Sequence, residues 1–178
     1  MSEKLSEPKV LISEKRIAER ISELAQEIRA DYAEKEIVAI CILKGAFVFY
    51  SDILRHLDLP VKCEFMAVSS YGDNRVSSGE VKLTLDIHDP LQDKHVMIFE
   101  DIVDSGGTLQ YLINVIRARK PASIKTCTLL LKPTSLRHEV SLDYVGFRIG
   151  PEFVVGYGMD DAGKYRGVPY IGYLEPEH

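Results

Sequence analysis

The chain has 178 residues, of which 46% are hydrophobic and 28% are charged, and its formal net charge is −5. A chain of this length can bury a substantial core and falls within the usual size of one domain, so we predict a single domain over residues 1–178. The acidic balance excludes a broad nucleic-acid-binding surface, although local sites for small anions stay open.

The three cysteines, Cys41, Cys63 and Cys127, each lie in an apolar stretch, and their odd number and spacing match no metal motif. We therefore expect reduced thiols in the core of a cytoplasmic protein. Residues 1–9 are polar and charged, and the sequence has no run of about eighteen apolar residues. Neither a signal peptide nor a membrane span is expected.

Helical and strand-like segments alternate along the chain. Ser13 is predicted to cap a helix whose apolar residues recur at helical spacing from Ile17 to Ile28. Continuous apolar runs, typical of buried parallel strands, occupy Ile37–Leu43, Val61–Ser69, His95–Phe99 and Ile124–Leu131. Helices are expected between them at Ala46–Leu57 and Leu109–Arg119. The alternation predicts an α/β fold, with a central, mostly parallel sheet flanked by helices.

Two stretches depart from this alternation. The polar, glycine-bearing segment 70–79 lies between strand-like runs at Cys63–Val68 and Val81–Leu85, which predicts a long mobile loop on a hairpin. From about residue 144, short apolar runs alternate with charged residues. We expect this part, 144–178, to form a small lobe over the sheet together with the N-terminal segment.

The most informative stretch runs from Val96 to Leu109, where an apolar strand leads into Glu100, Asp101 and Asp104 and then into a small-residue turn that opens a helix. Glycines allow close approach of the backbone, and free amides at a helix start bind phosphate oxygens, here with the hydroxyls of the turn. The anion-binding turn comprises Ser105, Gly106, Gly107 and Thr108.

The three acids would repel a phosphate unless they contacted another part of the same ligand, and carboxylates suit ribose hydroxyls and Mg²⁺. Taken alone, the acids also fit a simpler role, in which they complement the helix dipole beside an ordinary glycine turn. The stretch as a whole resembles the binding signature for phosphoribosyl pyrophosphate (PRPP) of the type I phosphoribosyltransferases. That resemblance implies the fold of this family and a role for Glu100, Asp101 and Asp104 in holding ribose phosphate.

Further segments, in order and spacing over about residues 11–174, resemble the hypoxanthine-guanine phosphoribosyltransferases. Leu43-Lys44-Gly45 looks like the pyrophosphate loop of that family, in which the peptide before the lysine can be cis. Without the resemblance, Lys44 is explained as a lysine at a strand end that points to water. The resemblance implies that pyrophosphate binds to Lys44 and Gly45. It also implies a contact from Arg166, which lies six residues after Asp160.

The base-binding residues are also implied by the resemblance. Lys132, at the end of an apolar strand, would donate to the exocyclic oxygen of a 6-oxopurine, which disfavours adenine. Phe153 would stack on the ring, while the main chain near Val154 and Asp160 would contact its edge. The simpler explanations are a surface lysine before Pro133 and a core phenylalanine.

The resemblance implies a Mg²⁺-dependent purine salvage reaction, in which hypoxanthine or guanine and PRPP give IMP or GMP and pyrophosphate. Glu100, Asp101 and Asp160 would bind the metal, although the neighbouring Asp161 leaves a shifted contact open. Asp104 would be the general base, or would only orient the purine. Catalytic roles are thus expected for Asp104, Lys132, Arg166, Lys44 and Tyr71.

Ser70 and Tyr71 match the pair that caps the closed site in the resembling enzymes, where they would lie at the pyrophosphate and exclude water. Two alternatives remain: the same chemistry with a preference for xanthine, and a non-catalytic regulator that senses PRPP. The resemblance also suggests a homodimer or homotetramer, and no nucleic-acid or membrane partner is expected.

Overall fold

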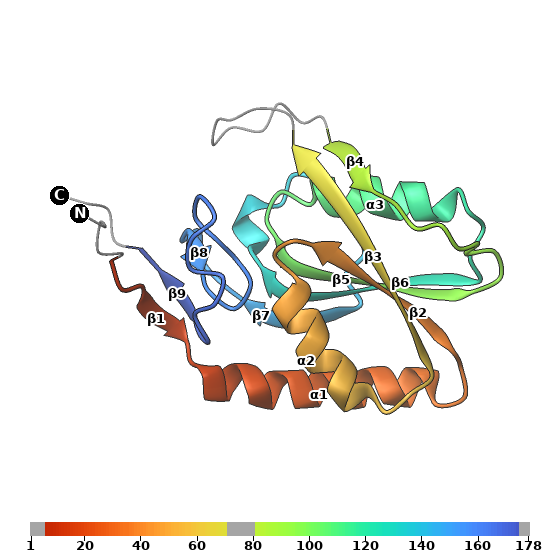
Figure 1. Cartoon of the computed structure of the whole chain (residues 1–178), viewed down its shortest axis with the longest axis horizontal. Coiled ribbons are helices and arrows are strands. Elements are labelled where there is room, and N and C mark those ends of the chain that lie inside the picture. Colours follow the sequence, from red (N-terminus) through yellow and green to blue (C-terminus); the bar gives the residue numbers. More distant parts are fainter. Residues whose placement is uncertain (1–5, 71–80, 175–178) are drawn as a thin grey trace.

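The computed structural model describes residues 6–70 and 81–174. Its main element is a six-stranded sheet in the order β4-β3-β2-β5-β6-β7, in which all pairs are parallel except that of β3 with the edge strand β4 (Figure 1). The strands of this sheet are β2 (Ile37–Leu43), β3 (Val61–Ser70), β4 (Val81–Leu85), β5 (His95–Val103), β6 (Ser123–Leu131) and β7 (Tyr144–Arg148). The helices are α1 (Glu14–Tyr32), α2 (Phe47–Leu57) and α3 (Gly107–Arg117).

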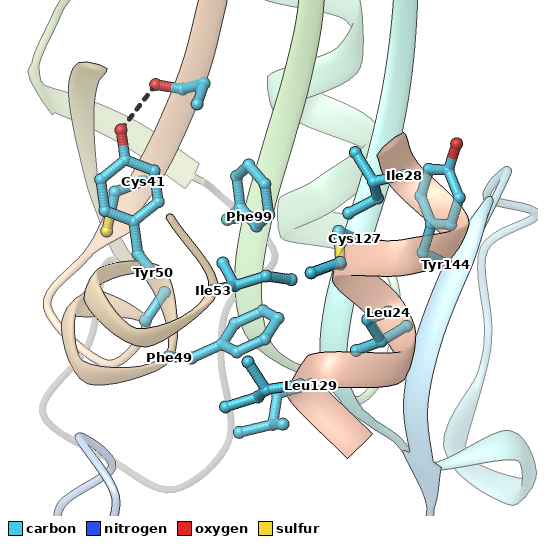
Figure 2. Close-up of a cluster of buried hydrophobic side chains, with 14 of the residues drawn as sticks. Leu24, Ile28, Cys41, Phe49, Tyr50, Ile53, Phe99, Cys127, Leu129 and Tyr144 are labelled. Atoms are coloured by element: carbon cyan, nitrogen blue, oxygen red, sulfur yellow. Dashed lines mark hydrogen bonds between the residues drawn. The ribbon is translucent and has the colours of Figure 1, made fainter. Parts of the chain in front are cut away.

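Helices cover both faces of this sheet, which explains why the central strand β2 is apolar at every position. Alternate residues of β2 belong to two separate cores: Ile37, Ala39 and Cys41 pack with α1 and α2, whereas Val38, Ile40 and Ile42 pack with α3. The predicted α/β architecture is confirmed. Figure 2 shows the first core, in which α1 and α2 place leucine, isoleucine and phenylalanine side chains against Phe99, Cys127 and Leu129 of the sheet.

The predicted start of α1 is confirmed, since the Ser13 side chain accepts a hydrogen bond from the Arg16 amide at 3.4 Å. The expectation of three core thiols is wrong for one of them. All three cysteines are free, but Cys63 is exposed on β3, while Cys41 and Cys127 are buried. This portion of β3 is only partly covered: Tyr50 of α2 packs edge-on against Phe65, with ring centroids 5.6 Å apart, yet Lys62, Cys63 and Phe65 are all exposed. An apolar run therefore indicated more burial than the strand has.

The small lobe is a second, antiparallel sheet in the order β1-β9-β8, made of β1 (Lys9–Ile12), β8 (Val154–Val155) and β9 (Ile171–Tyr173). It joins the N-terminal segment to the C-terminal part at one end of the molecule (Figure 1). The lobe starts later than residue 144, because β7 pairs in parallel with β6 and extends the main sheet. In the described part of the chain, no helix is both long and apolar enough to cross a membrane.

The predicted hairpin is present, since β3 and β4 pair antiparallel with Val68 opposite Leu83. The backbone of Ser70 ends β3 opposite Val81. Tyr71 and the rest of the predicted loop lie outside the described residues.

Candidate active site

The acids and the turn predicted to bind phosphate lie at the carboxyl end of β5. Strand β5 continues four residues beyond the predicted Phe99 because its pairing with β6 extends to Val103, opposite Leu131. Glu100 and Asp101 are therefore strand residues. The turn that follows reaches Gly106, which has φ +83° and precedes the first residue of α3. This left-handed conformation suits glycine and aims the first amides of α3 at the turn.

A cavity of about 360 Å³ opens at this edge of the sheet and is lined from β2, β3, β5, the start of α3, the residue after β6 and the C-terminal lobe. It brings together most of the residues predicted for the site: Lys44, Gly45, Glu100, Asp101, Asp104, Thr108, Lys132, Phe153, Val154, Asp160 and Arg166. Ser105 and Gly106 line an adjoining cavity of about 90 Å³. Among the described candidates, Gly107 lines neither of these two cavities.

Glu100 and Asp101 form a pair of carboxylates that lacks a full set of partners. Glu100 is 8% exposed, and its Oε2 atom has no hydrogen-bond partner. Burial, and next the charge of Asp101, raise the pKa of Glu100 well above its usual range. Burial also raises the pKa of Asp101, although its Oδ1 atom accepts from the Ile102 amide at 2.9 Å. A divalent cation at this pair would relieve both effects, so the residues fit Mg²⁺.

Asp160, the third predicted metal ligand, has other partners. Its Oδ1 atom lies 2.6 Å from Arg166 Nη2, and its Oδ2 atom accepts from the Gly163 amide at 2.7 Å. Within residues 6–70 and 81–174, no three acidic, histidine or cysteine side chains gather as a metal cluster. A metal at Glu100 and Asp101 would thus take oxygens from water or from a bound ligand, which is the usual coordination of Mg²⁺.

Lys132 and Asp104 form an ion pair beside the phosphate turn. Lys132 is only 6% exposed, and its Nζ atom lies 3.3 Å from Asp104 Oδ2. The Lys132 amide donates to the Val103 carbonyl at 3.0 Å, which fixes the lysine to the end of β5. A donor and an acceptor therefore lie side by side and can contact neighbouring acceptor and donor atoms of one heterocycle.

Three loops meet at Gly45. A Cβ atom at Gly45 would overlap the Asp101 carboxylate, and one at Gly158 would overlap the Gly45 carbonyl oxygen. Arg166 Nη1 donates to the Gly158 carbonyl at 2.7 Å. The peptide between Leu43 and Lys44 is cis, and Lys44 is exposed. At the mouth of the cavity, the loop after β2 consequently packs against the Asp101 side chain of β5 and against the backbone of the C-terminal lobe.

Phe153 stands at the entrance to the cavity and is 59% exposed, while the next residue, Val154, is buried in β8. A planar heterocycle bound in the cavity would stack on this ring, so we predict that Phe153→Ala raises the KM for such a substrate about tenfold. The melting temperature should change little, since an exposed ring contributes little to the core. Steady-state kinetics and thermal melts measure both. Phe65→Ala, which removes a ring that is 43% exposed on β3, is the matched control.

Sequence reasoning missed five apolar cavity residues: Ile42, Leu43, Val68, Ile102 and Met159. Met159 is 5% exposed and immediately precedes Asp160, and Ile102 follows the two acids of β5. These residues lie within segments that were already singled out in the sequence, and this position was the only indication that they line the site. They make part of the cavity wall apolar, which suits a flat heterocycle.

The fold and site define an α/β protein with a glycine turn at the start of a helix, a buried glutamate beside an aspartate, and a heterocycle-sized cavity at the carboxyl edge of its parallel strands. Residues 11–162 match the phosphoribosyl transferase domain family. The chain is 46% identical to a hypoxanthine-guanine phosphoribosyltransferase of Bacillus subtilis over 94% of this chain and 93% of that protein. It is 45% identical to the Dictyostelium discoideum protein of the same name, over 94% of this chain and 96% of that protein.

Solved structures agree with these matches. The crystal structure of a hypoxanthine-guanine phosphoribosyltransferase from Bacillus anthracis superimposes with a TM-score of 0.90 at 44% identity, over 95% of this chain and 100% of that chain. The chain belongs to the phosphoribosyl transferase domain family, and its fold is the type I phosphoribosyltransferase fold.

Proposed function

We propose that this chain is a purine salvage enzyme that transfers the phosphoribosyl group of PRPP to hypoxanthine or guanine, releasing pyrophosphate. The observation that carries the proposal is the ion pair of Lys132 and Asp104 beside the phosphate turn. On a 6-oxopurine, the exocyclic oxygen accepts hydrogen bonds and the adjacent imidazole ring carries a proton, and this edge matches the pair. The relatives named above are phosphoribosyltransferases for the same bases.

The remaining residues are assigned to the separate groups of PRPP and to the purine. The 5′-phosphate would bind the turn made by Ser105, Gly106, Gly107 and Thr108 at the start of α3. Lys44, Gly45 and Arg166 would bind the pyrophosphate group, with Ser70 and Tyr71 closing over it. Glu100 and Asp101 would orient the ribose hydroxyls, and Phe153 and Val154 would hold the purine.

Catalysis follows from this arrangement. The bond from the anomeric carbon to pyrophosphate breaks, the bond to the purine nitrogen forms, and Asp104 accepts the proton that the purine loses. The buried carboxylates favour positive charge on the sugar ring, while Lys44 and Arg166 favour negative charge on the leaving group. Mg²⁺ held by Glu100 and Asp101, with Asp160 as a further candidate ligand, would supply positive charge next to the leaving oxygens.

The proposal is tested with PRPP, Mg²⁺ and hypoxanthine, guanine, xanthine or adenine in parallel, with nucleoside monophosphate followed by ultraviolet absorbance. Hypoxanthine and guanine should react, and adenine should react at least about tenfold more slowly, because its amino group is a donor and cannot accept a hydrogen bond from Lys132. Faster turnover of xanthine would instead support the xanthine-preferring alternative. PRPP binding without turnover of any base would support a sensor.

Two features of the protein's setting are also proposed. The enzyme would act in the cytoplasm and would assemble as a homodimer or homotetramer. A relative supports assembly: in a Trypanosoma cruzi hypoxanthine phosphoribosyl transferase that is 40% identical to this chain, the C-terminal region has a role in the oligomeric state. Light scattering on the purified protein measures the mass directly.

A further inference from the structure

A left-handed turn in the C-terminal lobe carries a buried tyrosine. Gly156, Tyr157 and Gly158 have φ values of +93°, +49° and +100°. A Cβ atom added at Gly156 would overlap the Tyr170 carbonyl oxygen, and one added at Gly158 would overlap the Gly45 carbonyl oxygen. A bulky residue rarely adopts this conformation, so the surrounding contacts must hold Tyr157 in it.

The Tyr157 side chain is 6% exposed and belongs to the core beneath α1 and α2. Its hydroxyl donates a hydrogen bond to Oδ2 of Asp52 in α2, and Asp52 also pairs with Arg55 one turn later. Helix α2 begins at Phe47, directly after the loop that carries Lys44. The bond therefore connects the lobe to the helix that follows the proposed pyrophosphate loop.

The same turn supports the proposed pyrophosphate ligand from the lobe. Tyr157 N donates to the Val168 carbonyl at 2.7 Å, and Gly158 N donates to the Arg166 carbonyl at 3.0 Å. Arg166 Nη1 returns a bond to the Gly158 carbonyl at 2.7 Å. A shift of Tyr157 would move Arg166. Val154 would move less, because its strand pairs with β9.

We propose that Tyr157 and Asp52 are positioning residues that hold Arg166 and the Lys44 loop at the separation that pyrophosphate needs. The inference rests on the proposed function, because that function makes Lys44 and Arg166 ligands of pyrophosphate. Neither Tyr157 nor Asp52 lines the cavity, so both act through the backbone they fix. Loss of the bond between Tyr157 and Asp52 should weaken binding of the pyrophosphate group of PRPP and leave binding of the purine unchanged.

The test is Tyr157→Phe, which keeps the buried ring and removes the hydroxyl. The KM for PRPP and the calorimetric Kd for PRPP with Mg²⁺ should each rise about tenfold, the size expected for a lost hydrogen bond to a charged group. The KM for hypoxanthine should stay within about twofold. Asp52→Ala should reproduce the change, the double variant should add nothing further, and Asp52→Asn, which keeps an acceptor oxygen, should restore the PRPP constants.

Tyr144→Phe is the matched control, because Tyr144 is also buried and its hydroxyl also donates to a carboxylate, that of Asp31, away from the cavity. Equal effects of the two tyrosine variants on PRPP, or an equal rise in the KM for both substrates of Tyr157→Phe, would overturn the inference. Calorimetry needs no turnover, so the inference is judged even if every base in the panel fails to react. A wild-type protein that binds no PRPP would overturn both proposals.

Discussion

Replacing Gly45 by alanine is expected to lower kcat/KM for PRPP about a hundredfold, the loss that follows when reacting groups are displaced by about 1 Å. The new Cβ atom would occupy the space of the Asp101 carboxylate. Either Asp101 must turn away from the cavity, or the backbone that carries Lys44 must move out. Both responses separate groups that the proposed reaction needs together. Steady-state kinetics with varied PRPP measures the loss.

Gly167→Ala is the control for this prediction. Apart from its two chain neighbours, no residue has an atom within 4 Å of a Cβ atom built at Gly167, so the same substitution should leave kcat/KM unchanged. Thermal melts of both variants separate a local displacement from unfolding. Wild-type kinetics in a well-folded Gly45→Ala protein would show that this loop does not contact the reacting groups, and the assignment of Lys44 to pyrophosphate would fail with it.

Much of the fold could be predicted because its signal is local. The uninterrupted apolar run Ile37–Leu43 indicated a strand covered on both faces, and both cores confirm it. The errors arise where an adjacent strand or helix determines the length or the burial of a strand. His95–Phe99 looked complete because acids follow it, yet pairing with β6 extends the strand to Val103. Cys63 looked buried, but α2 covers this part of β3 only partially, through Tyr50 against Phe65, and leaves Cys63 exposed.

The site was predictable where its residues are consecutive and not where they meet in space. The turn after Asp104 is one continuous stretch, so its chemistry could be inferred from residue types. The contact of Gly45 with Asp101 joins different strands, and the bond from Tyr157 to Asp52 spans 105 positions. Nothing in the residue types of such pairs shows that they touch. Tyr157, in a glycine-flanked segment, had no sequence signal for its buried partner.

Asp104→Asn is the second large effect expected, with a fall in kcat of about 10²–10⁴, the contribution typical of a positioned general base. Asparagine has nearly the same shape and can still accept a hydrogen bond from Lys132, but it cannot take the purine proton. The phosphate turn is unchanged, so the Kd for PRPP should stay close to that of the wild type. Single-turnover measurements report the chemical step without product release.

The alternative role for Asp104 is to orient the purine, and the two roles separate in the kinetic constants. An orienting residue makes its contact in the bound complex as well, so its loss would raise the KM for hypoxanthine and leave most of kcat. A general base acts only as the proton moves, so its loss lowers kcat. Asp58→Asn, on the exposed end of α2 at φ +46°, changes the net charge equally and should alter neither constant. A KM effect alone in Asp104→Asn would assign proton removal to water or to another group.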